Sequence, residues 1–198
     1  RTPHWVDFSE VTPTTTILPK VVEAWNQSTK KLLLIGDQPK NEQLEKLLEE
    51  FSNDASVLVL SEKNSNVHAP NIIDEIDVLI SDFSETDKQQ FQPDILISIG
   101  GMLVSKRIKA LLRSHPPKYH YHVDATKAND TFGVLTQHFQ VNPNSFFEAF
   151  LPLTTAVESG YFAKIEKIKA LRKVKQESYL EKIPYSDFLV FDSIIRTL

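Results

Sequence analysis

Short apolar runs alternate with amphipathic segments along most of the chain. Runs of four to eight largely apolar residues are typical of strands that are buried inside a sheet. The pattern predicts strands over five ranges, which are 31–35, 56–60, 94–99, 119–124 and 137–141. Residues 94–99, with the sequence DILISI followed by two glycines, form the strongest of these runs.

Between and beyond these runs, apolar residues recur at spacings of three and four, which is the pattern of an amphipathic helix. The predicted helices cover 14–27, 42–51, 72–80, 84–90, 105–113, 142–150, 154–182 and 186–198. Strands that alternate with helices of about ten residues indicate a doubly wound α/β domain. We therefore expect a mostly parallel sheet with helices on both faces over residues 14–150, a Rossmann-like fold.

The two ends of the chain do not share this pattern. Residues 1–13 are predicted to be a linker from a preceding domain, and 151–184 a lysine-rich helical linker. In residues 185–198, a helical stripe that includes Phe188, Phe191 and Ile194 is still apolar at Leu198. We expect this last segment to be the first helix of a following domain, cut short.

Composition removes several classes of function. The 198 residues contain no Cys, which excludes disulfides, thiolate metal sites and a cysteine nucleophile. A net charge of −4 offers no basic footprint for nucleic acid, and no apolar run approaches the length of a membrane span. With only five Gly, neither G-x-G-x-x-G nor the P-loop pattern occurs.

The strongest candidate for binding chemistry follows the strand predicted at 94–99. Gly100 and Gly101 lead into Ser105, Lys106 and Arg107 at the start of a predicted helix. Ligands of open α/β sheets bind beyond the carboxyl ends of the strands, where a helix N-terminus attracts anions. Arg107 could bind a carboxylate through two hydrogen bonds while Lys106 acts as a point charge. The alternative is a solvated cationic surface.

Two weaker patterns leave their alternatives open. His120, His122 and Asp124 fall on one face of a predicted strand, with the residue types of a two-histidine, one-carboxylate metal site. Hydrogen bonds from these histidines to neighbouring loops are the simpler explanation. Asp37 after Gly36 could hold a ribose, but Gly-Asp is also an ordinary turn pair. A hydrolytic triad is set aside because no G-x-S-x-G motif is present.

Three stretches resemble the central domain of thiamine-diphosphate enzymes, specifically the menaquinone-biosynthesis synthases known as the MenD family. They are QPDILISIGGMLVSKRI (92–108), YHYHVD (119–124) and TQHF (136–139), and YSDF (185–188) resembles the start of that family's diphosphate-binding domain. The resemblance implies a fragment of a three-domain, cytoplasmic, homo-oligomeric transferase. That enzyme uses thiamine diphosphate and Mg²⁺ or Mn²⁺ to decarboxylate 2-oxoglutarate, and adds the succinyl semialdehyde unit to isochorismate.

The resemblance carries Ser105, Lys106 and Arg107 over as residues that help to hold substrate carboxylates. It also implies that the catalytic, cofactor and metal residues lie in domains outside this chain, since the family's G-D-G motif is missing: Gly36 and Asp37 continue as Gln38. The chain alone is then expected to be an inactive scaffold with one carboxylate-binding corner. The alternatives are a stand-alone nucleotide- or flavin-binding domain and a purely structural oligomerisation module.

Overall fold

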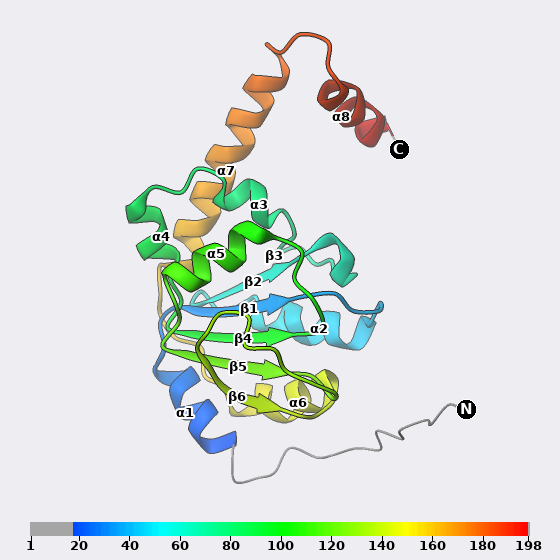
Figure 1. Cartoon of the computed structure of the whole chain (residues 1–198). Coiled ribbons are helices and arrows are strands. Elements are labelled where there is room, and N and C mark those ends of the chain that lie inside the picture. The colour runs from blue at the N-terminus through cyan, green and yellow to red at the C-terminus, as the bar shows by residue number, and fades with distance from the viewer. Residues whose placement is uncertain (1–17, 198) are drawn as a thin grey trace, which may run out of the picture.

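The computed structural model describes residues 18–197 and contains a fully parallel six-stranded sheet (Figure 1). The strands are β1 (Lys31–Ile35), β2 (Val57–Ser61), β3 (Ile72–Ile73), β4 (Ile95–Ile99), β5 (Tyr119–Val123) and β6 (Leu135–Phe139). Their order is β3-β2-β1-β4-β5-β6, so the chain first moves outward from β1 and then returns to its other side. This order confirms the predicted doubly wound fold and places its switch point between β1 and β4.

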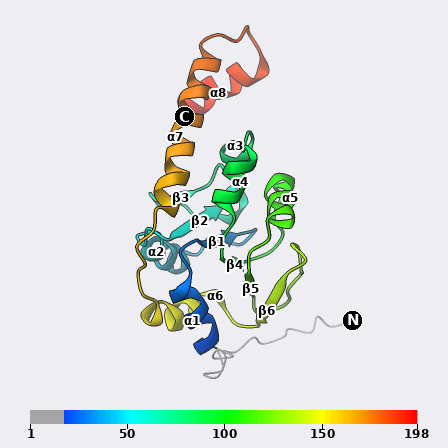
Figure 2. The same ribbon diagram turned by 90° about the vertical axis from the view of Figure 1, so that its left-hand side faces the viewer.

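Helices cover both faces of the sheet. They are α1 (Leu18–Gln27), α2 (Glu42–Phe51), α3 (Ile76–Ile80), α4 (Glu85–Phe91), α5 (Lys106–Ser114), α6 (Pro143–Phe150), α7 (Tyr161–Leu180) and α8 (Asp187–Thr197), with short 3₁₀ turns at Lys63–Ser65 and Leu151–Leu153. Buried residues of α1, α2 and α6 share one apolar core, and those of α3, α5 and the start of α7 share the other. Figure 2 shows α7 extending away from the sheet, with α8 turned back beside its far end.

The strand sequences produce these two cores because successive side chains of a strand point to opposite faces. In β1, Leu33 and Ile35 join the α1, α2 and α6 side, whereas Leu32 and Leu34 join the α3 and α5 side. The first core is closed by an aromatic cluster of Trp25, Phe51, Phe146, Phe147 and Phe150, in which Trp25 meets Phe51 edge-on at 5.6 Å. Each such buried ring contributes about 2 kcal/mol to stability.

The sheet departs from a regular doubly wound pattern between β5 and β6. A parallel crossover is usually made by a helix, yet residues 124–134 contain none. This loop covers the adjoining face of β4 and β5 mainly with Phe132, whose ring meets His120 edge-on at 5.1 Å. A pocket lined by Ser98, His120 and His122, among others, lies beneath this loop.

Three predicted elements need correction. Residues 72–80 do not form one helix: Ile72 and Ile73 pair with β2 as the edge strand β3, and α3 begins only at Ile76. The strand predicted at 137–141 is β6, two residues earlier. The helix predicted from 154 begins at Tyr161, because the preceding segment is held outside a helix by hydrogen bonds such as Thr155 N–H to Asn26 Oδ1 (2.9 Å).

Helix α7 is only partly anchored. Tyr161 and Ile165 are buried, and the Tyr161 hydroxyl donates to the Phe91 carbonyl at 2.6 Å. Farther along, Leu171 and Val174 are exposed, as are several apolar residues of α8. The predicted roles of 151–184 and 185–198 as a linker and a neighbouring domain's helix stay predictions, while 1–13 and the first four residues predicted for helix 14–27 lie outside the described residues.

Across residues 18–197, we find no helix that combines the length and the apolar character needed to cross a membrane.

Candidate functional site

The loops after β1 and β4 meet at the switch point and contact each other through their backbones. Gly36 N–H donates to the Ile99 carbonyl at 2.9 Å, and Gly101 N–H donates to the Asp37 carbonyl at 2.8 Å. A Cβ on Gly36 would lie 2.6 Å from the Gly101 carbonyl oxygen, and Gly100 has a φ of 77°. The glycines therefore allow the two loops to close on each other. They occupy the crevice in which doubly wound folds usually bind a nucleotide.

Beyond this contact, the chain from β4 runs along the carboxyl edge of the sheet toward β2. Asp37 N–H donates to the Met102 carbonyl (3.4 Å), and the N–H groups of Val104 and Ser105 then reach Glu62, the residue after β2. Ser105 ends this crossing and caps α5, with its Oγ accepting from Ile108 N–H at 3.1 Å. The start of α5 therefore lies on the β2 side of the switch point.

The predicted binding residues lie at this helix start, and their environments differ. Ser105 is buried, and its hydroxyl donates to an Asp77 carboxylate oxygen. Lys106 and Arg107 are exposed, and neither forms an ion pair with another residue in the described range. Arg107 makes one long hydrogen bond, 3.4 Å, to the Asp77 carbonyl. Two cationic side chains therefore remain available to an anionic ligand.

Lys106 and Arg107 border an open groove of about 720 Å³ between the end of β2, α3 and the start of α5. Its lining combines apolar side chains, Ile76, Val78 and Val104, with both signs of charge. The acidic members are Glu62, Asp74, Glu75 and Asp77, and the basic members are Lys63, Lys106 and Arg107.

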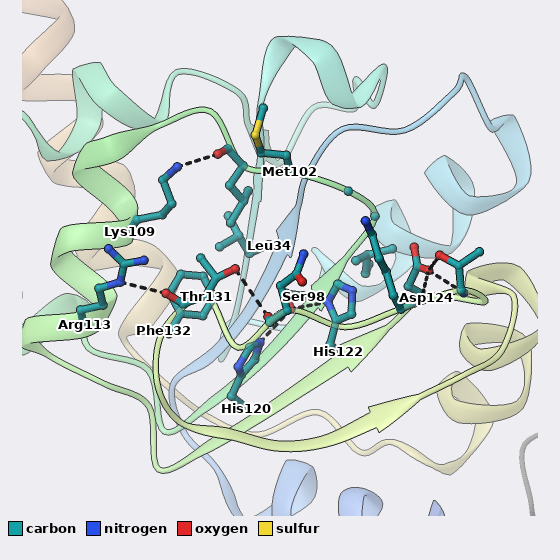
Figure 3. A pocket seen from close by; sticks show the side chains of 17 residues that line it. Leu34, Ser98, Met102, Lys109, Arg113, His120, His122, Asp124, Thr131 and Phe132 are labelled. Atoms are coloured by element: carbon teal, nitrogen blue, oxygen red, sulfur yellow. Dashed lines mark hydrogen bonds between the residues drawn. The ribbon is translucent and has the colours of Figure 1, made fainter.

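A second, separate pocket of about 430 Å³ lies under the helix-free loop between β5 and β6 (Figure 3). Its floor is formed by Ser98 of β4 and by His120 and His122 of β5, and Lys109 and Arg113 of α5 stand at its side. Both cations already have partners, because Lys109 Nζ donates to the Leu103 carbonyl (2.9 Å) and Arg113 Nε to the Thr131 carbonyl (2.8 Å). They tie the neighbouring loops to α5.

Ser98 links the two histidines. Its hydroxyl lies 2.8 Å from His120 Nε2 and 2.9 Å from His122 Nδ1. Since a hydroxyl has one proton, it donates to one imidazole and accepts from the other, which suits two neutral rings. Burial lowers the pKa of His120 to about 4 and also lowers the pKa of His122. Buried His120 Nδ1 has no hydrogen-bond partner among the described residues.

The alternation predicted for His120 and His122 is correct, but they do not form a metal centre with Asp124. No group of three or more His, Asp or Glu within residues 18–197 is arranged to hold a metal ion. Asp124 instead accepts from Thr126 Oγ1 (2.6 Å) and from the N–H groups of Thr126 and Lys127. Burial alone would raise the pKa of Asp124, but these hydrogen bonds outweigh it and lower that pKa.

No protein-family model matches the chain. Individual proteins do match, and all of the following are named 2-succinyl-5-enolpyruvyl-6-hydroxy-3-cyclohexene-1-carboxylate synthase. The chain is 47% identical to the one from Flavobacterium johnsoniae over 180 residues, 90% of the chain and 32% of that protein. It is 44% identical to that of Flavobacterium psychrophilum (98% of the chain, 35% of that protein) and 38% identical to that of Christiangramia forsetii (91% and 32%).

The chain belongs to this family of synthases. It spans about a third of the length of the curated relatives that it matches. The similarity to these synthases thus extends from the stretches 92–108, 119–124 and 136–139 to nearly the whole chain.

The described residues do not fit thiamine diphosphate and its metal, the cofactors implied by the resemblance. Gly36, Gly100 and Gly101 are engaged in loop-to-loop contacts and form no cradle for a diphosphate. Clusters of acidic and histidine side chains suited to a metal are also absent from residues 18–197. In a complete synthase, other segments would have to hold the cofactor, so no step of its chemistry is assigned to this chain.

Two parts of the site were not predicted from the sequence. Glu62 lies outside every strand and helix predicted from the sequence, although it directly follows the buried strand β2 at the edge where ligands bind. The position of Glu62 just beyond the strand predicted at 56–60 could have identified it from the sequence. The link from Ser98 to both histidines depends on the register that sets Ser98 beside His122 in neighbouring strands, and no local pattern reveals such pairing.

Proposed function

We propose that the chain is the central α/β domain of a thiamine-diphosphate-dependent synthase of menaquinone biosynthesis. The complete enzyme would decarboxylate 2-oxoglutarate and add the succinyl semialdehyde unit to isochorismate, with thiamine diphosphate and Mg²⁺ or Mn²⁺ held by its other domains. Support comes from the homologous synthases, of which the chain matches about a third. Alone, the chain would be inactive. We further propose that the complete enzyme is a cytoplasmic homo-oligomer.

Within that enzyme, we infer that Lys106 and Arg107 bind carboxylates of the substrates. The observation that supports this role is the exposure of two consecutive cations without ion-pair partners among residues 18–197, beside a groove with an apolar wall. Both substrates carry two carboxylates. Arg107 can offer two parallel N–H donors to a carboxylate, and Lys106 adds a compact charge.

A stand-alone dinucleotide-binding domain is the main rival. The strand order favours it, because β3-β2-β1-β4-β5-β6 is the order of dinucleotide-binding folds. The backbone contact between the β1 and β4 loops argues against it, since a pyrophosphate needs the space that Gly101 and Asp37 fill. The identity to full-length synthases also favours the synthase domain.

The test replaces Lys106 and Arg107 by Ala, singly and together, in the full-length synthase. Loss of a charged hydrogen bond is worth about 1.5–3 kcal/mol, so each replacement should raise KM for at least one of 2-oxoglutarate and isochorismate by about 10- to 100-fold. Lys46→Ala, an exposed lysine of α2 on the opposite face, is the matched control and should leave both KM values unchanged. Unchanged KM values in the double variant would refute the assignment.

A further inference from the structure

The backbone N–H groups of the two residues that precede α5 are bound to a carboxylate of the chain itself. Glu62 is only 8% exposed, and its two side-chain oxygens accept from Val104 N–H at 2.7 Å and Ser105 N–H at 2.6 Å. Its own backbone is also fixed, because its carbonyl accepts from both the N–H (2.9 Å) and the hydroxyl (2.6 Å) of buried Ser65. Glu62 is thus a rigid support, rather than a flexible surface acid.

This arrangement follows from the physics of helix ends. The first N–H groups of a helix lack partners within the helix, and the positive end of its dipole attracts a negative charge. Glu62 places a negative charge beside this helix start and accepts from the N–H groups of Ser105, the N-cap, and of Val104 before it. A substrate carboxylate therefore cannot use these two N–H groups and is left to the exposed residues Lys106 and Arg107.

A second acid holds the same segment from another element. Asp77, in α3, accepts a hydrogen bond from the Ser105 hydroxyl, and its carbonyl accepts from Arg107 Nη1 at 3.4 Å. The segment before α5 is therefore fixed from the end of β2 and from α3 at once. Of the two supports, Glu62 is the more buried. Its hydrogen bonds to this segment come from main-chain N–H groups.

We propose that Glu62 is a positioning residue for the carboxylate-binding pair Lys106 and Arg107. It fixes the segment before α5, so that both cations face the groove in one geometry. This inference rests on the proposed function, because it assumes that the pair binds a substrate carboxylate. Glu62 itself does not touch the substrate.

The decisive variant is Glu62→Gln in the full-length synthase. Glutamine keeps the size and one carbonyl oxygen, but its NH₂ group would face an N–H donor, so one hydrogen bond and the charge are lost. Misplaced binding groups weaken recognition of the substrate. We expect KM for the substrate held by Lys106 and Arg107 to rise about tenfold, a loss comparable to that of one charge-assisted hydrogen bond, with a much smaller change in kcat.

A matched control and a double-mutant cycle separate positioning from general damage. Glu42→Gln also neutralises an acid at a helix start, but Glu42 is exposed and, within residues 18–197, forms its ion pair with Lys40, so KM should not change. If Glu62 acts through the pair, Glu62→Gln should add little to KM in the Lys106→Ala, Arg107→Ala background. A purely structural role would give additive effects.

Hydrogen exchange in the 198-residue chain provides a readout independent of catalysis. The amides of Val104 and Ser105 should exchange about tenfold faster in Glu62→Gln, while amides of the central strands keep their rates and show that the domain is folded. Unchanged exchange would overturn the inference. So would an unchanged KM, or additive effects, when the Lys106 and Arg107 variants do raise KM. If those two variants leave KM unchanged, the proposed function fails first and the inference fails with it.

Discussion

The two polar corners at the carboxyl edge of the sheet are built in opposite ways. Under the β5–β6 loop, His120 and His122 both hydrogen-bond to the Ser98 hydroxyl, and burial lowers the pKa of both imidazoles. At the start of α5, Lys106 and Arg107 are exposed to solvent, and neither forms an ion pair within residues 18–197. The comparison teaches that burial, rather than residue type, separates groups that stabilise the domain from groups that are free to bind a ligand.

The two corners are joined by one loop. Residues 100–105 leave β4 beside Ser98, contact the β1 loop through glycines, and end on Glu62 at the start of α5. A change in this junction should therefore disturb both corners, whereas a change within one corner should leave the other intact. The predictions below test this division.

The largest effect is expected from Gly36→Ala at the junction. The new Cβ would lie 2.6 Å from the Gly101 carbonyl oxygen, so the two loops must separate. We expect a loss of about 3 kcal/mol in the free energy of unfolding, measured by urea denaturation of the 198-residue chain. Gly160→Ala is the control, because its Cβ would have only the flexible end of Lys164 nearby, at 3.8 Å. Equal stability of the two variants would contradict the account of the junction.

The contact between these two loops could not be predicted from the sequence. Apolar runs and amphipathic segments were sufficient to predict five of the six strands and most helices, because the central strands are buried on both faces and helices repeat their apolar positions every three or four residues. The small number of glycines excluded the phosphate-binding motifs, but composition could not show that Gly36 meets Gly101. That contact depends on β1 and β4 being neighbours, although more than fifty residues separate them along the chain.

The second effect concerns pH and belongs to the neutral corner. The pKa of His120 falls from 6.5 to about 4 because of burial and, secondarily, the neighbouring His122; Asp130 opposes the shift. A histidine with a lowered pKa in the folded state stabilises the fold least in acid, because the unfolded chain takes up a proton that the folded chain refuses. Stability is therefore complete above pH 6.5 and falls toward pH 4. Between pH 7.5 and pH 5 the His120 contribution amounts to about 2 kcal/mol.

This dependence is measured by urea denaturation at several pH values on the native chain and on His120→Gln. The variant will be less stable throughout, but its stability should depend less steeply on pH by the amount given above. His68→Gln, the same substitution at an exposed histidine, is measured alongside as the control. A His120→Gln variant with the native slope would show that this imidazole is not held neutral by burial.

For Lys106 and Arg107, the sequence predicted which residues could bind an anion, but not which residues surround them. Lys106 and Arg107 were identified because they follow a strong strand and begin a helix, the place where anions bind. The helix dipole was part of that argument, and here the structure is more specific. Glu62, more than forty residues earlier, accepts from the N–H groups of Val104 and Ser105, the two residues before the helix. Long-range pairing of this kind has no local signal.

The smallest effect is expected from Lys106→Ala and Arg107→Ala, measured as stability of the 198-residue chain. Both side chains are exposed, and the single long hydrogen bond of Arg107 adds little. The double variant should therefore lose no more than about 0.5 kcal/mol on urea denaturation. The same double variant should show the largest rise in KM in the full-length synthase, so a large stability loss would erase the distinction between a binding corner and a structural one.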